Sequence, residues 1–407
     1  MNRLIKIVCV LAACLGMLSS CARTDKERSK ILKIYNWADY IDEGILDEFP
    51  VWYKEQTGED IRIIYQVFDI NEIMLTKIER GHEDFDLICP SEYIIERMLK
   101  KKLLLPIDRN FGKTPDYLDN ISPYIREQLN KLSQPGMETT DYVVPYMWGT
   151  AGLLYNTGRS NDLGLPLEPP LQEQDPDERQ LPRRLRHSHH LRPCQRTGRR
   201  HRHGRTADER QLPRSHRHRR GLPETHEAQH RRMGSRKEMM TKNKAWLNLT
   251  WSGDAVWAIE EAEAVGVELG YEVPREGSNI WYDGWAIPKY ARNVKAASYF
   301  LDYLCRPDIA LRNMDANGYV SAVATPEILE AKIDTTIEEY SNLSYFFGPG
   351  NDSIRIDRVQ YPDRKVVERC AMIRDFGDET ELVLEMWSRV KGDNLNTGIV
   401  LLIFAVF

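Results

Sequence analysis

Residues 31–157 alternate between segments with the apolar spacing of a strand and segments with that of a helix. Residues 31–35 form a short run of strand-like composition, and large apolar side chains then recur at helical spacing from Ile45 to Tyr53. The same pattern predicts strands at 61–67 and 85–89 and helices at 71–80 and 94–102. This alternation is typical of an α/β fold, whose ligands bind where strands reach the carboxyl edge of the sheet.

The pattern returns after residue 237. It predicts a strand at 245–249, the polar-aromatic stretch TWSGD, a helix, and another strand at 270–274. Residues 280–288 are predicted to cross back as a strand, and residues 291–304 to form an amphipathic helix. The three cysteines in these regular parts are an odd number without the spacing of a metal site, so we interpret them as buried small apolar residues: Cys89, Cys305 and Cys370.

The N-terminus has the features of an export signal. A basic start precedes an apolar run at 7–17 that is too short to span a bilayer, and the run ends in LSSC at Cys21. This ending resembles a bacterial lipobox, so we expect a signal peptide at 1–20, lipid on Cys21 and a polar tether at 21–30. The alternative is an ordinary secretory signal with a chance cysteine. Either reading predicts an exported protein, and the first holds it at a membrane surface by lipid.

Residues 158–236 differ in composition from the rest of the chain. These 79 residues contain no Lys, Val, Ile, Phe, Tyr or Trp, and they hold nine of the ten histidines. They carry 19 Arg against 10 Asp and Glu, a net charge of +9 in a chain whose net charge is −5. A nucleic-acid-binding arm would mix Lys with Arg and interleave aromatic residues, and a zinc site would place a few ligands at defined spacing. Neither pattern is present.

A shifted reading frame explains this composition better. Between Arg179 and Arg205, 22 of 27 residues are Leu, Pro, His, Gln or Arg, the five amino acids whose codons can begin with C. Codons can be chosen for 179–192 that spell DSYRDAYGTAIIYA when read one base later, and 163–172 and 226–236 likewise yield WASLWNPRYK and MKPNIAGWEAD. We infer out-of-frame translation that is restored near Lys237. Because only nine of the 79 residues are Leu, Ile, Val or Phe, we expect the segment to be disordered as written.

Several in-frame motifs carry a resemblance to a known family: YNWADY, CPSEY, VPYMWGT, LTWSGDA, IWYDGWAIP and LCRPDIA. They resemble the spermidine/putrescine-binding proteins of bacterial ABC importers over about 31–157 and 237–391, as do the decoded WASLWNPRYK and DSYRDAYG. The resemblance implies a type II periplasmic-binding-protein fold, whose two lobes close on the ligand like a hinge. Lobe 1 is expected at 31–147 and 284–330. Lobe 2 is expected at 148–283 and 331–391, partly disrupted by the anomalous segment.

The chemistry of a polyamine explains which side chains such a site needs. Carboxylates pair with its ammonium groups, and aromatic faces cover its methylenes and favour the cations. By resemblance, Asp283 pairs with an amine, Ser91 hydrogen-bonds one, Asp39 is a possible extra carboxylate, and the aromatic walls are Trp37, Tyr40, Tyr93, Trp251 and Trp281. Taken singly, Trp37 and Tyr40 fit half-buried packing, Asp283 a turn, and Ser91 a helix N-cap. Only their combination favours a binding site.

The resemblance therefore predicts a lipid-anchored, monomeric solute-binding component that passes spermidine or putrescine to ABC permease subunits at the periplasmic or cell surface. It predicts no enzyme activity, cofactor, metal or nucleic acid. The alternatives are a binding protein for another cationic solute, or an envelope protein whose Arg/His-rich insert binds nucleic acid or metal. Two departures from the family stand out. Its second-lobe acidic ligands lie in the decoded DSYRD, which the written chain lacks, and a late polar contact falls near Met372 or Ile373.

Overall fold

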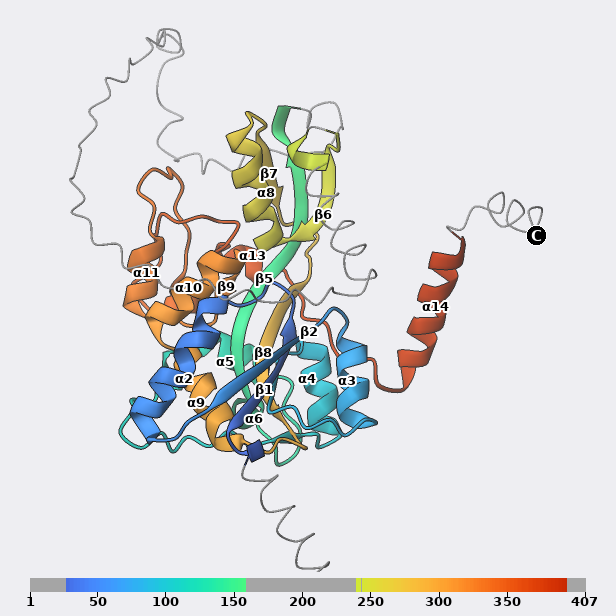
Figure 1. Ribbon diagram of the computed structural model, residues 1–407. Coiled ribbons are helices and arrows are strands. Elements are labelled where there is room, and N and C mark those ends of the chain that lie inside the picture. Colours follow the sequence, from blue (N-terminus) through green and yellow to red (C-terminus); the bar gives the residue numbers. More distant parts are fainter. Residues whose placement is uncertain (1–26, 159–238, 243, 394–407) are drawn as a thin grey trace, which may run out of the picture. The chain divides into compact units, whose positions relative to one another are not determined.

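Three parallel strands begin the sheet of the computed structural model, which describes residues 27–158, 239–242 and 244–393 (Figure 1). β1 (Ile31–Trp37) pairs in parallel with β2 (Arg62–Phe68) on one side and with β3 (Leu87–Ile88) on the other. The helices that connect or follow them are α2 (Glu43–Thr57), α3 (Asn71–Glu79) and α4 (Glu92–Lys100). Parallel strands end at one edge of a sheet, so the segments after β1 and β3 are neighbours.

Local sequence sets the limits of α2. The side chain of Asp42 accepts a hydrogen bond from the Gly44 N–H at the helix start, and Gly58 ends the helix in the left-handed region at φ 75°. Ile45, Phe49 and Tyr53 lie one turn apart and are buried on the same helix face. The spacing seen in the sequence is therefore the spacing of the packed face.

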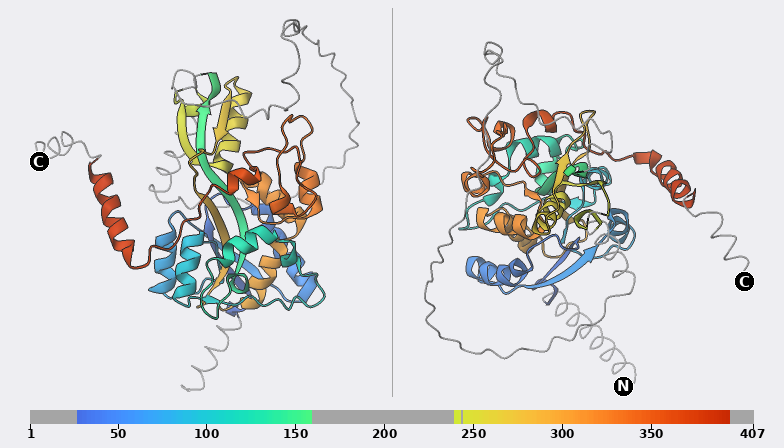
Figure 2. Two further views of the ribbon diagram at one scale, coloured as in Figure 1. Left: turned by 180° about the vertical axis from the view of Figure 1, so that it is seen from behind. Right: turned by 90° about the horizontal axis from the view of Figure 1, so that it is seen from above.

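Two long antiparallel strands continue the sheet, and the views in Figures 1 and 2 show them side by side. β5 (Val143–Asn156) pairs with β8 (Ile280–Pro288) through its first half and with β6 (Leu247–Trp251) and β7 (Leu269–Glu272) through its second half. β8 also pairs with β3 and with β4 (Leu104–Leu105). All nine residues of β8 are buried, including one charged residue, Asp283.

The remaining elements surround these strands. The first group is η1 (Tyr117–Asn120), α5 (Pro123–Asn130), α6 (Thr139–Tyr142) and α8 (Ser252–Ala264). The second is α9 (Val294–Leu304), α10 (Pro307–Asn317), β9 (Val320–Ser321) and α11 (Pro326–Lys332). The last is α12 (Ser344–Phe347), α13 (Arg364–Val367), η4 (Gly377–Glu379) and α14 (Thr380–Asp393).

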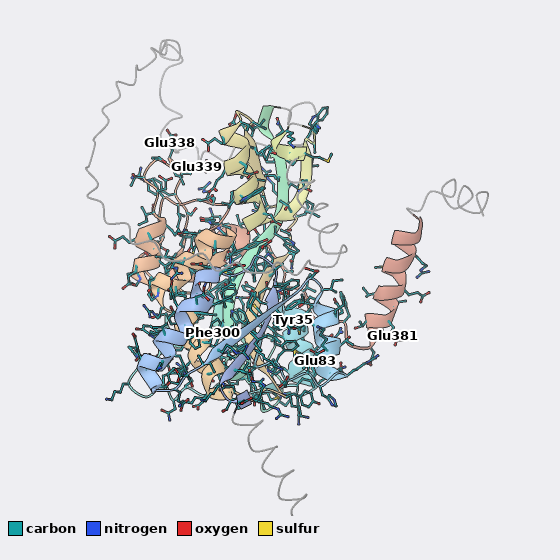
Figure 3. The ribbon with its side chains drawn as sticks, viewed as in Figure 1. Tyr35, Glu83, Phe300, Glu338, Glu339 and Glu381 are labelled. Carbon is teal, nitrogen blue, oxygen red and sulfur yellow. The ribbon has the colours of Figure 1, made fainter. Side chains whose placement is uncertain are left out.

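The described residues contain one large apolar core and one small one. In the large core, Phe300 of α9 (labelled in Figure 3) lies 4.9 Å from Phe49 and 6.1 Å from Trp285, measured between ring centres. The small core lies along the second half of β5 and consists of six buried residues: Leu154, Met240, Ala255, Ala258, Ala262 and Leu269. Beside it, Leu249 and Trp251 of β6 are 70% and 42% exposed. This second core is thin for an independently stable unit.

Most predicted elements are present, with several shifts in their bounds. The strand predicted at 85–89 is reduced to Leu87–Ile88, and Pro90, two residues further on, has no N–H to donate to a neighbouring strand. The strand predicted at 245–249 lies at Leu247–Trp251, so the expected turn is its end and the start of α8. The helix predicted from 291 begins at Val294, because the Asn293 side chain accepts the Ala296 N–H as its cap.

Some predictions fall outside the described residues: the signal peptide 1–20, lipidation at Cys21, and the anomalous segment from 159 to 236 with its expected disorder. The predicted tether 21–30 is described from residue 27, and there Arg28 binds Asp84 at 2.7 Å and Asp86 at 3.0 Å. The end of that segment is thus held by the folded body. The lobe limits at 147/148, 283/284 and 330/331 stay predictions. In the described part of the chain, no helix has the length and apolarity to cross a membrane.

Candidate ligand-binding site

Asp283 lies in the middle of β8 and is only 7% exposed. Its Oδ2 accepts a hydrogen bond of 2.8 Å from the Tyr40 hydroxyl, and the Ser91 side chain also hydrogen-bonds the carboxylate. Its Oδ1 is buried and accepts no hydrogen bond from the described residues. Burial raises the pKa of Asp283 to about 6, while the bonds from Ser91 and Tyr40 act in the opposite direction. The fold therefore holds a carboxylate that is partly desolvated and has one oxygen open to a donor.

Ser91 occupies the N-cap position of α4, yet its side chain makes no capping hydrogen bond. It pairs instead with Asp283 across an isolated antiparallel bridge, and its Oγ accepts a bond of 3.1 Å from Asn71 Nδ2. The same Asn71 nitrogen lies 3.2 Å from the hydroxyl of Tyr93, which donates to Glu72 at 3.1 Å. Asn71 thus links two predicted site residues. The sequence contains no signal for this role, because Asn71 looks like an ordinary first residue of a helix.

Tyr40 follows the turn after β1. Asp39 precedes it with a positive φ of 53° and is exposed, so the chain reverses there and turns the Tyr40 side chain inward. The Tyr146 hydroxyl donates to the Tyr40 carbonyl at 2.8 Å and holds this turn against β5. Burial, followed by the charge of Asp283, raises the pKa of Tyr40 well above its ordinary value. Tyr40 therefore stays a hydrogen-bond donor at neutral pH.

Aromatic rings meet beside this carboxylate. Trp281 lies edge-to-face with Tyr319 at 5.1 Å and with Trp251 at 6.0 Å between ring centres, and Tyr319 lies 5.8 Å from Tyr40. The sequence interpretation missed Tyr319, which follows the end of α10 and carries no motif. The structure thus brings Tyr40, Trp251 and Trp281 together around a residue that sequence reasoning did not select.

Tyr319 also connects a second carboxyl group to the site. Its hydroxyl hydrogen-bonds Asp254, and the charges of Asp254 and Asp283 both contribute to raising its pKa, after burial as the largest cause. Asp254 belongs to the TWSGD stretch but was not selected as a site residue. Its partner Tyr319 packs on Gly253, where an added Cβ would lie 2.3 Å from the ring. The phenol ring therefore lies between two carboxylates, in a place that only glycine at 253 permits.

Trp37 and Asp39 have contacts of a different kind. The Trp37 ring packs against Phe68 of β2 at 4.5 Å, and its carbonyl oxygen lies 3.4 Å from the hydroxyl of Tyr65. These are the contacts of a half-buried packing residue at the end of β1. Asp39 is exposed in the next turn. The ligand roles of these two residues stay predictions.

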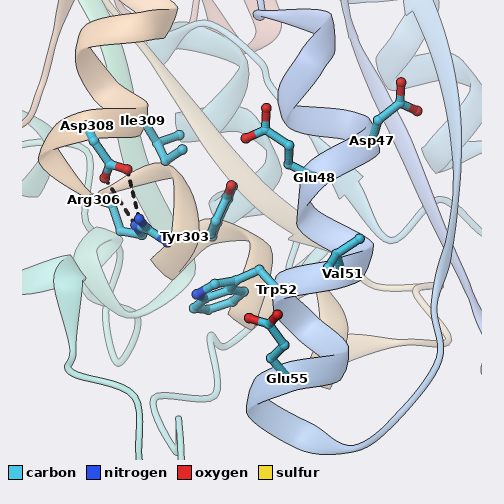
Figure 4. A pocket seen from close by; sticks show the side chains of 9 residues that line it. All are labelled: Asp47, Glu48, Val51, Trp52, Glu55, Tyr303, Arg306, Asp308 and Ile309. Atoms are coloured by element: carbon cyan, nitrogen blue, oxygen red, sulfur yellow. Dashed lines mark hydrogen bonds and ion pairs between the residues drawn. The ribbon is translucent and has the colours of Figure 1, made fainter. Parts of the chain in front are cut away.

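A separate surface cleft of about 420 Å³ lies between α2 and the start of α10 (Figure 4). Its lining residues are Asp47, Glu48, Val51, Trp52, Glu55, Tyr303, Arg306, Asp308 and Ile309, and none of them is a predicted site residue. Arg306 pairs with Asp308 at 2.7 Å, and Arg312 pairs with Glu48 at 2.6 Å. Several charged side chains that line the cleft thus already form ion pairs within the protein. Among the described residues, no group of three or more His, Cys, Asp or Glu side chains is arranged to hold a metal ion.

Comparison with solved structures agrees with this architecture. The substrate-binding protein of a spermidine/putrescine ABC transporter from Streptococcus pneumoniae superposes with a TM-score of 0.53 at 24% identity, over 88% of this chain and 98% of that one. A spermidine/putrescine transporter protein from Listeria monocytogenes gives the same TM-score at 23% identity, over 88% and 98%. These likenesses establish the two-lobed fold of type II periplasmic binding proteins. Residues 234–337 match the family model of bacterial extracellular solute-binding proteins.

This chain is similar to bacterial solute-binding proteins that bind polyamines. The match to the family model begins at residue 234, three residues before the regular part of the chain resumes at residue 237. A putrescine-binding periplasmic protein of Pseudomonas aeruginosa is 25% identical over 89% of this chain and 92% of its own length. A putrescine-binding periplasmic protein of Escherichia coli is 28% identical over 73% of this chain and 80% of its own length. A spermidine/putrescine-binding periplasmic protein of the same species is 25% identical over 93% of this chain and 96% of its own length. These relatives are transport proteins and belong to no enzyme family.

Proposed function

We propose that this solute-binding protein captures a polyamine, spermidine or putrescine, outside the cytoplasm and delivers it to the permease subunits of an ABC importer. The observation that carries the proposal is Asp283, a buried carboxylate held by Tyr40 and Ser91 and bordered by aromatic rings. An ammonium group supplies what this carboxylate lacks, because it brings a positive charge and N–H donors for the open Oδ1. The names of the relatives support a polyamine as its source.

A second carboxyl group, Asp254, offers a partner for the other end of a diamine. A diamine has an ammonium at each end, and the methylenes between the two ends need apolar cover. Tyr319 and Trp281 form an edge-to-face pair at 5.1 Å next to Asp283, and Asp254 hydrogen-bonds the far side of Tyr319. We infer that one ammonium pairs with Asp283, the methylenes lie over the aromatic rings, and Asp254 receives the second ammonium.

Three further parts of the proposal concern residues beyond the site. Cys21 is proposed to carry lipid that holds a monomeric protein at the membrane surface. Residues 158–236 are proposed to be out of frame, so that a frame-corrected chain, with this segment replaced by the product read one base later, completes lobe 2. Nucleic acid, metal and cofactor are not part of the proposed function. The start of the family match at residue 234 supports the frame reading.

Isothermal titration calorimetry on the frame-corrected chain tests the ligand. We expect putrescine or spermidine to bind, and Asp283→Asn to weaken binding by about 3–5 kcal/mol, because a desolvated ammonium would be left without its counter-charge. Ser91→Ala should weaken it by about 1 kcal/mol, the contribution of an ordinary hydrogen bond. Asp352→Asn is the matched control, since Asp352 is exposed and outside the site.

The outcomes separate the alternatives. Equal affinities for wild type and Asp283→Asn would remove Asp283 from the site. A competition series across diamines, triamines and aromatic cations decides whether the cationic solute is a polyamine or another amine. If none of these compounds binds while the protein remains folded by circular dichroism, the proposed function is wrong.

A further inference from the structure

Glu92, the first residue of α4, is a second buried carboxyl group beside Asp283. It is 1% exposed, and in the described part of the chain it forms no ion pair. Its Oε2 accepts the backbone N–H of Tyr282 at 3.1 Å. This hydrogen bond ties the Glu92 side chain to β8.

The backbone places the two carboxyl groups at neighbouring positions. Ser91 and Asp283 face each other in an antiparallel bridge, Glu92 follows Ser91 in α4, and Tyr282 precedes Asp283 in β8. Glu92 thus binds the strand residue next to Asp283 from the segment that also contacts Asp283. Burial, and then the charge of Asp283, raise the pKa of Glu92 to about 8. The charge state of Asp283 therefore affects the pKa of Glu92, as their neighbouring positions in the backbone lead one to expect.

The tyrosine hydroxyls and the cysteine thiol around Asp283 and Glu92 stay protonated, and therefore neutral, near neutral pH. From β8, the Tyr282 hydroxyl lies 3.4 Å from that of Tyr124 on α5, and burial raises the pKa of both. Burial likewise raises the pKa of Tyr40, Tyr93 and Cys89. These groups therefore stay neutral in the range where the two carboxyl groups titrate.

The other charged groups nearby are already bonded. On α4, Glu96 pairs with Arg374 at 2.9 Å, and hydrogen bonds to Arg374 and Asp375 help to hold the pKa of Glu96 below its usual value, against the opposing effect of burial. From α3, Glu72 accepts the Tyr93 hydroxyl. Asp375 pairs with Arg97 at 2.7 Å. Among these described neighbours, Asp283 and Glu92 are thus the groups whose charge changes near neutral pH.

We propose that Glu92 is a positioning residue that couples cation capture at Asp283 to release of its own proton. In the empty site, Glu92 is held as the neutral acid beside an ionised Asp283. An incoming ammonium neutralises the charge of Asp283, so the Glu92 O–H bond breaks, its proton leaves to bulk water, and the carboxylate is retained. The ammonium keeps all its protons, and both carboxyl groups are then ionised. This inference rests on the proposed function, since it requires a cation at Asp283.

The sign of the resulting pH dependence follows from proton linkage. Binding that releases a proton becomes tighter as pH rises. Asp283, with a pKa of about 6, contributes to proton release on binding below pH 7. Glu92, with a pKa of about 8, contributes to it between pH 7 and 8. Glu92→Gln keeps an oxygen that can accept the Tyr282 N–H but has no proton to lose. It therefore separates the charge of Glu92 from its structural hydrogen bond.

Calorimetric titration of the frame-corrected chain with putrescine, between pH 5.5 and 8.5 and in buffers of differing ionisation enthalpy, tests the coupling. We expect wild-type affinity to rise between pH 7 and 8 with measurable proton release, by at most about tenfold, the limit for one proton per pH unit. Glu92→Gln should bind putrescine with less than about twofold change over that range, while keeping the release below pH 7. Asp352→Asn should behave like wild type.

Each outcome decides the proposal separately from the proposed function. Absence of putrescine binding, with none by spermidine either, contradicts the proposed function. Binding without proton release above pH 7, or the same release in wild type and Glu92→Gln, overturns the role of Glu92 alone. If Glu92→Gln does not fold, the wild-type buffer series still decides, because zero proton release at pH 7.5 contradicts the coupling.

Discussion

The carboxylate of Asp283, which we propose to bind a cation, also lowers the stability of the empty protein when it is ionised. Its neighbours remove it from water, and two hydrogen bonds from Tyr40 and Ser91 recover only part of the lost hydration. The raised pKa of Asp283 reflects this incomplete replacement of its hydration. A site that binds a cation tightly therefore places an ionised group where the empty protein would be more stable without it.

This incomplete replacement of hydration predicts the effect of Asp283→Asn on stability without ligand. The folded pKa of about 6 lies above the ordinary value of 3.8, so the contribution of this group to stability is complete below about pH 3.8 and is lost as pH rises through 6. At pH 8, Asp283→Asn should raise the free energy of unfolding by up to about 3 kcal/mol, and at pH 3.5 it should change little. Urea unfolding at both pH values measures the difference. A destabilised variant at pH 8 would contradict the desolvation argument.

At the scale of elements, α8 packs against the residue that follows α10 through one glycine, Gly253. Gly253 lies in the first turn of α8, and the Tyr319 ring fills the space that its missing side chain leaves. The same ring carries the hydrogen bond to Asp254 and the edge-to-face contact with Trp281. The position of α8 therefore determines where two walls of the site lie.

Gly253→Ala tests this fit, because helix propensity and packing predict opposite signs. Alanine in a helix is favoured over glycine by about 1 kcal/mol. The new Cβ would lie 2.3 Å from the Tyr319 ring, however, so we expect net destabilisation of about 1–3 kcal/mol and weaker polyamine binding. Glu261→Ala, on the exposed face of α8, is the control and should do neither. Thermal melts and calorimetry measure both effects, and a stabilised Gly253→Ala with full affinity would contradict the fit.

For the whole molecule, the two apolar cores differ greatly in size. The large core joins β1, β3 and β8 with α2 and α9, whereas the small core has six buried residues next to an exposed Leu249. The second half of β5 and its partners β6 and β7 belong to the small core. Apolar burial is therefore thin along the second half of β5, whereas other residues predicted in lobe 2, such as Trp148 and Phe346, belong to the large core.

We expect the written chain to bind polyamines weakly and the frame-corrected chain to bind them well. Without a complete lobe 2, hinge closure cannot exclude water, so Asp283 acts at high dielectric. A ligand that binds only the folded state stabilises it by about 2.7 kcal/mol at a hundredfold excess over Kd. Thermal melts of both chains with millimolar spermidine or putrescine compare them. An equal rise in Tm in the written chain would mean that residues 158–236 support binding as they stand.

The sequence by itself determined the α/β alternation, the position of most strands and helices, and the candidates Tyr40, Ser91 and Asp283. Apolar spacing reports which face of each element is buried, and the motifs around these residues are local. Only the tertiary structure decided that the Ser91 hydroxyl binds Asp283 and does not cap α4. Only the tertiary structure brought Asn71, Tyr319, Asp254 and Glu92 to the site as well. Their contacts join segments far apart in the chain, and no local pattern encodes which buried polar groups meet across a folded sheet.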